Sequence, residues 1–144
     1  MCQRTALALY DLYALRSTIF VVDLARQFCA SRKKKLMILL SYGSYHVLQA
    51  LHGKPRFDQE LIEHLKGTKL PAVDTLAAHV DDYRAFRVTP EEYIKRHYIG
   101  HYNPAGNHFF AFAIKNALLD WLDPKPLTYS TEDASIAESV AKFA

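Results

Sequence analysis

The sequence predicts an α/β fold in which short parallel strands alternate with helices. Two short apolar runs, residues 35–41 and 70–74, are set off by charged, glycine or proline residues and are typical of strands. Apolar residues recur at steps of three and four in the segments around these runs, which indicates helices. A chain that alternates strands with helices in this order predicts a parallel sheet joined by right-handed crossovers.

The first helix is expected over residues 5–32, which contain neither glycine nor proline. Its apolar stretch is interrupted by Asp11, Arg16 and Asp23, and each of these charges is costly in a hydrocarbon layer. The stretch also lacks the basic start and short apolar core of a signal peptide. We therefore expect a helix buried on a wide face, with no membrane span, and the sequence assigns no compartment.

The middle of the chain supplies both strands. The expected elements are, in order, a strand over 35–41, a helix over 44–52, a helix over 58–66, a strand over 70–74 and a helix over 75–86. The first strand is apolar throughout, as in a strand buried on both faces. Pro71 must lie at the start or edge of the second strand because it donates no backbone hydrogen bond. Asp74, at the end of that strand, is expected to be a structural cap.

Two more helices follow. Thr89-Pro90-Glu91-Glu92 has the pattern of a capping box with proline at the first helical position, so a helix is expected to about residue 97. A loop then leads into a helix over 107–122. We expect one domain over residues 1–125 and a polar tail over 126–144, with a weak helix from Ser135.

Two strands alone make a poor sheet, because their outer edges present unpaired backbone groups beside an apolar core. Something is expected to cover these edges: a missing part of the same polypeptide, a second copy of the chain, or the long first helix. On this argument the domain is incomplete.

Composition excludes some classes of function. The formal net charge is +3 and the basic residues cluster only at 32–35, whereas a nucleic-acid-binding domain needs a broader basic face. The two cysteines, Cys2 and Cys29, have no metal or redox spacing.

The segment most informative about function is His97-Tyr-Ile-Gly-His101-Tyr-Asn103-Pro104-Ala-Gly106-Asn107-His108-Phe-Phe-Ala111. It places His101 in a loop with glycine and proline, directly before a long helix. Such a loop can hold an imidazole accessible at the end of a sheet, where it could serve as a general base. The alternative is a loop histidine that is simply bonded to backbone carbonyls.

This segment resembles the last conserved block of the SGNH hydrolases, the GDSL-like lipases and esterases. The match is dense over residues 101–111, and the order of strands and helices extends it over about residues 30–125. The resemblance implies a flavodoxin-like three-layer fold with long flanking helices, of which the chain is the C-terminal half. It places the family's catalytic base at His101 and the turn into the final helix at Gly106 and Asn107, with Asn103 as a supporting polar residue.

Two departures from the family weaken the site. The triad acid should stand at position 98 or 99, where this chain has Tyr98 and Ile99, so Asp81 or Asp82 would have to substitute. The family's serine block, oxyanion-hole glycine and Gly-x-Asn-Asp block are absent, and we expect that the chain begins too late to contain them. Ser44 follows a strand but lacks both this serine block and a Gly-x-Ser-x-Gly motif, so it is disfavoured as a nucleophile.

A metal site at His97, His101 and His108 is also disfavoured. Asn103, Pro104 and Gly106 break the helix that would align the three histidines, and the cluster holds no carboxylate.

The resemblance implies ester hydrolysis that needs no cofactor, with a small acyl ester or an O-acetylated saccharide as substrate. The serine and oxyanion donors would come from an upstream segment or a separate chain. The alternative is a non-catalytic remnant, a pseudoenzyme module that acts in association or ligand binding.

Overall fold

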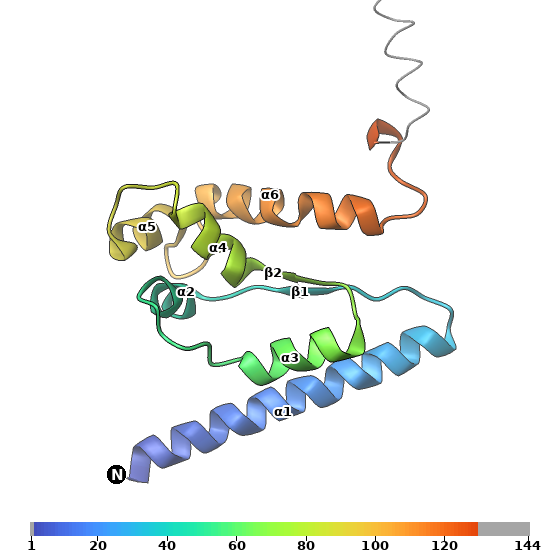
Figure 1. Cartoon of the computed structure of the whole chain (residues 1–144), viewed down its shortest axis with the longest axis horizontal. Coiled ribbons are helices and arrows are strands. Elements are labelled where there is room, and N and C mark those ends of the chain that lie inside the picture. The colour runs from blue at the N-terminus through green and yellow to red at the C-terminus, as the bar shows by residue number, and fades with distance from the viewer. Residues whose placement is uncertain (1, 130–144) are drawn as a thin grey trace, which may run out of the picture. The chain divides into compact units, whose positions relative to one another are not determined.

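The computed structural model describes the backbone of residues 2–129 and the side chains of residues 9–126, 128 and 129. The elements are α1 (Cys2–Ser31), β1 (Ile38–Leu40), α2 (Ser44–Leu51), α3 (Gln59–Thr68), β2 (Ala72–Asp74), α4 (Thr75–Tyr83), α5 (Pro90–His97), α6 (Pro104–Trp121) and a 3₁₀ turn η1 (Leu127–Tyr129). The chain divides into two compact units, Met1–Ile94 and Lys95–Ala144 (Figure 1). The weak helix expected from Ser135 lies outside the described residues.

The first unit contains a two-stranded parallel sheet. Ile38 pairs with Ala72, Leu39 with Val73 and Leu40 with Asp74. The backbone N–H of Ile38 donates to the carbonyl of Pro71, so this proline lies just before β2, at the strand start expected for it. The parallel pairing of the two apolar runs, with α2 and α3 in the connection between them, is confirmed.

The expected α/β class, with its three-layer, flavodoxin-like architecture, is wrong. Six α-helices dominate the described residues, and the sheet there consists of two strands of three residues each. No further described segment pairs with β1 or β2, and Leu39, at the centre of β1, is 41% exposed. A strand buried on both faces needs helices on each side, and β1 does not have that cover.

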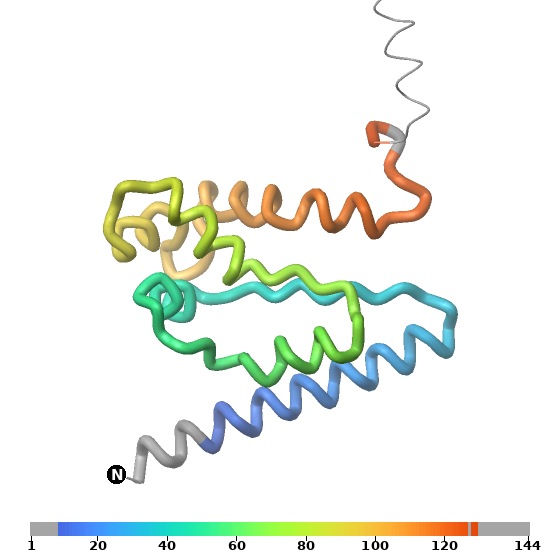
Figure 2. The backbone as a smooth tube through the Cα atoms, in the orientation of Figure 1, coloured from blue at the N-terminus to red at the C-terminus, as the bar shows by residue number. Residues whose placement is uncertain are grey.

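The core of the first unit lies between α1 and α3, which run side by side (Figures 1 and 2). Val22 of α1 packs with the buried Leu61 and Leu65 of α3. Partly buried residues of the helix and the strands close around this contact: Leu15, Ile19, Ile38, Leu40 and Leu70. Each buried aliphatic side chain contributes about 1.5–3 kcal/mol of transfer free energy, so this cluster is the main apolar link between α1 and the rest of the unit.

The wide burial expected for the first helix is also wrong, because α1 is covered on one side. Its opposite side exposes large apolar side chains, namely Tyr10, Tyr13, Phe20, Val21, Leu24 and Phe28. At about 100° per residue these positions fall on one side of the helix. The packed residues Leu15, Ile19 and Val22 lie about half a helical turn away, on the other side. The periodicity therefore predicts the helix correctly, although α1 has two apolar faces and, among the side chains that the structure describes, only one of these faces is packed.

Caps fix the starts of α4 and α5. The Asp74 carboxylate accepts hydrogen bonds from the backbone of Leu76 and Ala77, which makes it the N-cap of α4, as expected. Before α5, the Glu92 side chain accepts from the Thr89 backbone at 2.8 Å while Thr89 Oγ1 accepts from the Glu92 backbone at 3.3 Å. The capping box read from the sequence is thus present in both directions.

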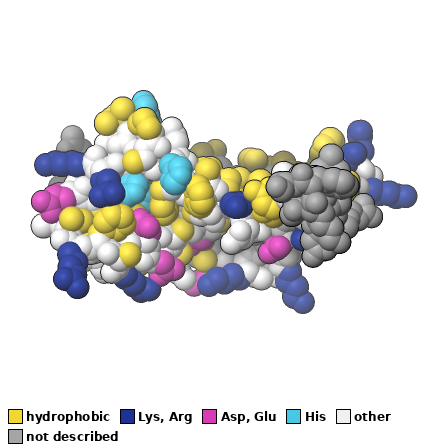
Figure 3. Space-filling view, turned by 90° about the horizontal axis from the view of Figure 1, so that it is seen from above, with side chains coloured by type: hydrophobic (Ala, Val, Ile, Leu, Met, Phe, Trp, Pro, Cys, Tyr) yellow, Lys and Arg dark blue, Asp and Glu magenta, His cyan; other side chains and the backbone are white. Residues whose placement is uncertain are grey.

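The charged side chains are dispersed over the surface. In the view of Figure 3, Lys and Arg side chains are spread around the margins with acidic and apolar groups between them. Of the helices described, none is both long and apolar enough to cross a membrane.

Candidate functional site

The loop that carries His101 is a tight turn closed by its two flanking tyrosines. Tyr98 and Tyr102 form an antiparallel bridge, and their rings stack with centroids 4.6 Å apart. Within the turn, the Ile99 N–H donates to the His101 carbonyl at 2.8 Å, and Gly100 has φ of +92°. Glycine adopts this left-handed conformation without the steric penalty that a Cβ brings, so the turn holds His101 at a defined place.

The helix after this loop begins earlier than the sequence indicated. Asn103, not Asn107, is the N-cap of α6, since its side chain accepts from the Gly106 N–H at 2.9 Å and Pro104 is the first helical residue. Asn107 lies inside the first turn and donates its backbone N–H to the Asn103 carbonyl.

Gly106 has a packing role in place of the turn role expected for it. A Cβ on Gly106 would collide with the carbonyl oxygen of His97 and would lie 2.5 Å from the Tyr102 ring. The absence of a side chain therefore lets α6 approach the residues that frame the loop. Gly106 and Asn103 together fix the position of the His101 turn against the helix.

His101 itself is exposed and oriented. Its Nδ1 lies 2.8 Å from the carbonyl oxygen of Tyr102. Because a carbonyl oxygen can only accept, this bond requires the tautomer with the proton on Nδ1, which leaves a lone pair on Nε2. The imidazole is therefore bonded to a backbone carbonyl, as one reading of the sequence held, and it also has the tautomer of a general base.

The two aspartates named as substitute acids have partners of their own in the first unit. Asp81 accepts from Arg84 at 2.6 Å, and Asp82 accepts from the Tyr93 hydroxyl at 2.8 Å. Tyr98 and Ile99 carry no acid. Over residues 9–126, the structure shows no carboxylate bonded to His101.

The other histidines of the segment lie in different surroundings. His97 is buried with its ring 5.7 Å from Phe109, whereas His108 is exposed beside Phe112 on α6. No group of three His, Cys, Asp or Glu side chains in the described residues could hold a metal ion. Ser44 is the first residue of α2, whose N-cap is Gly43.

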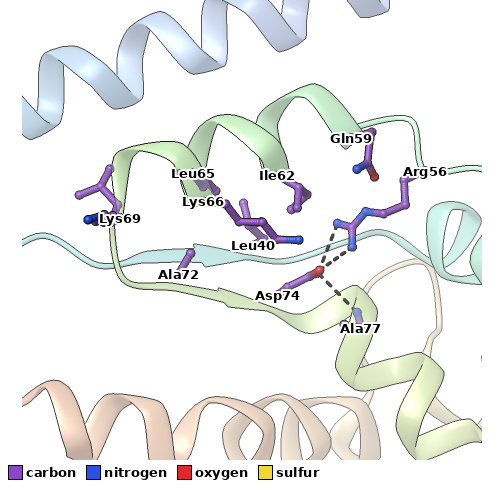
Figure 4. Close-up of a pocket in the computed structure, with 11 residues that line it drawn as sticks. Leu40, Arg56, Gln59, Ile62, Leu65, Lys66, Lys69, Ala72, Asp74 and Ala77 are labelled. Carbon is purple, nitrogen blue, oxygen red and sulfur yellow. Dashed lines mark hydrogen bonds and ion pairs between the residues drawn. The ribbon is translucent and has the colours of Figure 1, made fainter.

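A second polar cluster, which the sequence did not reveal, lies at the carboxyl end of the sheet. Arg56 makes a two-point contact with Asp58, from Nε to Oδ1 and from Nη2 to Oδ2, both at 3.0 Å. Its Nη1 donates to Asp74 Oδ2 at 2.5 Å (Figure 4). Its Nη2 donates to the Tyr42 hydroxyl at 2.8 Å. The Tyr42 hydroxyl in turn donates to Asp58 at 2.6 Å. We refer to Tyr42, Arg56, Asp58 and Asp74 as the Arg56 cluster.

The protonation of this cluster is set by burial and by its own contacts. Burial raises the pKa of Asp58, but the hydrogen bonds from Arg56 and Tyr42 and the charge of Arg56 outweigh it and hold the pKa below its usual range. Burial and the bond to Asp58 raise the pKa of Tyr42. Burial lowers the pKa of Arg56, yet its bonds to Asp58 and Asp74 raise it overall. Asp58 is therefore ionised and Tyr42 neutral at neutral pH.

The signal for the Arg56 cluster was present in the sequence. Tyr42 follows the first apolar run and Asp74 ends the second, and the carboxyl ends of parallel strands meet at one edge of a sheet. Arg56 lies in the connection between them, after Pro55. Sequence reasoning treated Asp74 as a cap alone, whereas it both caps α4 and binds Arg56.

A third polar group is buried under α4. His79 and Tyr93 are fully buried, and His79 Nδ1 lies 2.9 Å from the Tyr93 hydroxyl. That hydroxyl donates to Asp82, so it accepts from His79. The contact links α4 to α5.

Comparison with known proteins identifies no relative of the chain. No family model matches the chain, and neither the curated proteins nor the solved structures include a match.

Proposed function

We propose that the chain carries the histidine half of an ester-hydrolase site, in which His101 is the general base. The observation that carries the proposal is the orientation of the imidazole: the Tyr102 carbonyl accepts from Nδ1 at 2.8 Å, and the ring is exposed. In serine hydrolases the triad carboxylate holds this same tautomer. Here a backbone carbonyl takes over that part of its role.

The reaction follows the chemistry of acyl transfer. His101 Nε2 accepts the proton of a serine hydroxyl as its oxygen attacks the ester carbonyl, and the imidazolium then protonates the departing alcohol. Water, deprotonated by the same nitrogen, releases the acid from the serine. No described serine is bonded to His101, so another segment or a second chain must bring the serine and the oxyanion donors to the loop. An acyl ester or an O-acetylated saccharide is the expected substrate.

A neutral carbonyl orients the imidazole but stabilises its cation less than a carboxylate does. The proposal therefore predicts slow turnover. A second candidate, a non-catalytic binding module, is favoured by the lack of a described carboxylate at His101.

Labelling with a fluorophosphonate probe, read by intact mass, separates these two functions. The wild-type chain is compared with His101→Ala and with His108→Ala, which removes an exposed histidine from the same segment. One adduct on the wild-type chain and on His108→Ala, but none on His101→Ala, supports the ester-hydrolase proposal. Equal labelling of all three chains contradicts a role for His101. No labelling of the wild-type chain means that this chain does not itself supply an activated serine, so the serine of an ester hydrolase would have to come from a separate chain.

A further inference from the structure

A cavity in the first unit lies between α3 and the two strands, beside the Arg56 cluster (Figure 4). Its volume is about 520 Å³, within the range of about 300–1,000 Å³ that small-molecule sites occupy. It is lined entirely by residues between Leu40 and Ala77, so it belongs to one unit and does not involve the His101 loop.

One wall of this cavity is apolar. Leu40 of β1, Ile62 and Leu65 of α3, Leu70 and Ala72 line it. Leu65 is buried and continues into the packed core, whereas Ala72 is exposed and leaves room above β2. An aliphatic chain placed here would remove apolar surface from water at both the helix and the strand.

The rim of the cavity carries an excess of positive charge. Arg56, Lys66 and Lys69 line it against the single carboxylate of Asp74. Arg56 is already neutralised, since it is paired with both Asp58 and Asp74.

The two lysines are not neutralised in this way. Among the described side chains, neither Lys66 nor Lys69 has a carboxylate within ion-pair distance. Figure 4 shows the Lys66 side chain extended along the cavity above Leu40, with its amino group toward the Arg56 end. An ammonium group that lies over an apolar wall without a counter-ion favours an anionic group on the ligand.

We propose that this cavity binds an aliphatic carboxylate, with its chain on the Leu40–Ile62–Ala72 wall and its carboxylate at Lys66. Each of the two parts of such a ligand has a counterpart on the protein. The proposal goes beyond the ester-hydrolase function, because the site lies in the first unit and requires neither His101 nor a serine.

Octanoate is the probe for this site, and 1-octanol, which keeps the chain but not the charge, is its matched comparison. Titration of the full chain, followed by ¹H–¹⁵N correlation spectra, is expected to give saturable shifts at amides of residues 62–74 with octanoate. The alcohol is expected to bind about three- to fivefold more weakly, because a charged contact at an exposed lysine is lost.

Three variants assign the head and the tail of the ligand. Lys66→Met is expected to weaken octanoate binding about three- to fivefold, because Lys66 is exposed. Ala72→Leu is expected to abolish binding by filling the wall. Lys34→Met makes the same change of charge at an exposed lysine outside the cavity lining and is expected to change binding less than about twofold, since distant surface charges are screened. The spectra themselves show whether each variant is folded.

Three results would overturn the proposal. The first is octanoate binding that is weakened equally by Lys66→Met and Lys34→Met, which indicates unspecific attraction. The second is saturable binding that survives Ala72→Leu unchanged. The third is no saturable shift at residues 62–74, including the case in which sedimentation shows a dimer that covers the cavity.

Discussion

Arg56→Met is expected to destabilise the first unit strongly, because it removes the only cation of the Arg56 cluster. Asp58 has a side chain that is 3% exposed and would keep its charge with Tyr42 as its remaining described side-chain partner. Removing one partner of a fully buried ion pair costs about 3–5 kcal/mol. The Arg56 and Asp74 side chains keep 22% and 26% of their surface exposed, so we expect about 2–3 kcal/mol once solvent screening is included.

The loss is measurable by urea unfolding followed by circular dichroism. With a slope of about 1–2 kcal/mol per molar urea for a unit of this size, the midpoint falls by about 1–3 M. Small domains have a total stability of about 5–15 kcal/mol, so the variant is expected to fold but to be marginal.

Arg84→Met is the matched control. Arg84 also binds an aspartate, Asp81, at 2.6 Å, but the two side chains are 73% and 69% exposed. Exposed pairs contribute about 0–1 kcal/mol, so the midpoint is expected to move little. If the two variants lose the same stability to within about 0.5 kcal/mol, the buried-cluster reasoning is refuted.

A double-mutant cycle separates the pair from its surroundings. Asp58→Asn removes the charge that Arg56 neutralises, so Arg56→Met should cost less in that background than in the wild type. A coupling of about 1–3 kcal/mol is expected for residues in one network, and strict additivity would contradict a direct Arg56–Asp58 interaction.

Three further outcomes are expected. The lowered pKa of Asp58 contributes stability that is present above the unfolded-state value of about 3.9 and is lost as pH falls through the folded value. The free energy of unfolding of Asp58→Asn, measured in urea, should therefore fall less between neutral and acidic pH than that of the wild type. Equal slopes against pH would exclude Asp58 as the cause. Gly106→Ala should destabilise the second unit by about 1–3 kcal/mol in thermal unfolding, because the added methyl group collides with His97. Gly67→Ala in α3, whose methyl group meets nothing within 4 Å, should instead stabilise the chain by about 0.4–1 kcal/mol. A change of the same sign in both variants would contradict this packing. Thr89→Ala should cost about 0.5–2 kcal/mol by removing one side of the capping box, and no change would mean that the box adds nothing.

The sequence predicted the parts of the fold that local rules decide. The parallel pairing of residues 38–40 with 72–74, the cap at Asp74 and the box at Thr89 all follow from short patterns that carry their own physical cause. The extent of the sheet does not follow from such patterns. An apolar run shows that a strand can be buried, but its cover comes from segments distant in the chain, and Leu39 remains exposed without it.

The start of α6 illustrates the same limit at smaller scale. Asn103 and Asn107 both precede the apolar run 109–114 in the sequence, and either can cap a helix by residue type. Pro104 decides between them, because proline fits the first turn of a helix and its missing N–H needs no partner there. The prediction assigned Pro104 to the loop, so it placed the helix start three residues too late and missed Asn103 as the cap.

The polar groups of the chain differ in whether their contacts leave a donor or acceptor atom available for a substrate, and this difference indicates where chemistry can occur. In the Arg56 cluster, the guanidinium binds both carboxylates and the phenol, so the cluster is suited to joining β1, β2 and α4. His101 has one nitrogen fixed by a backbone carbonyl and the other exposed. A group that is oriented but still has an unbonded nitrogen or oxygen can exchange a proton with a substrate. A group whose polar atoms are all hydrogen-bonded must first break contacts that stabilise the fold. His101 is therefore the stronger candidate for catalysis, and the cavity beside the Arg56 cluster is the stronger candidate for binding, since its lysines remain without a described counter-ion.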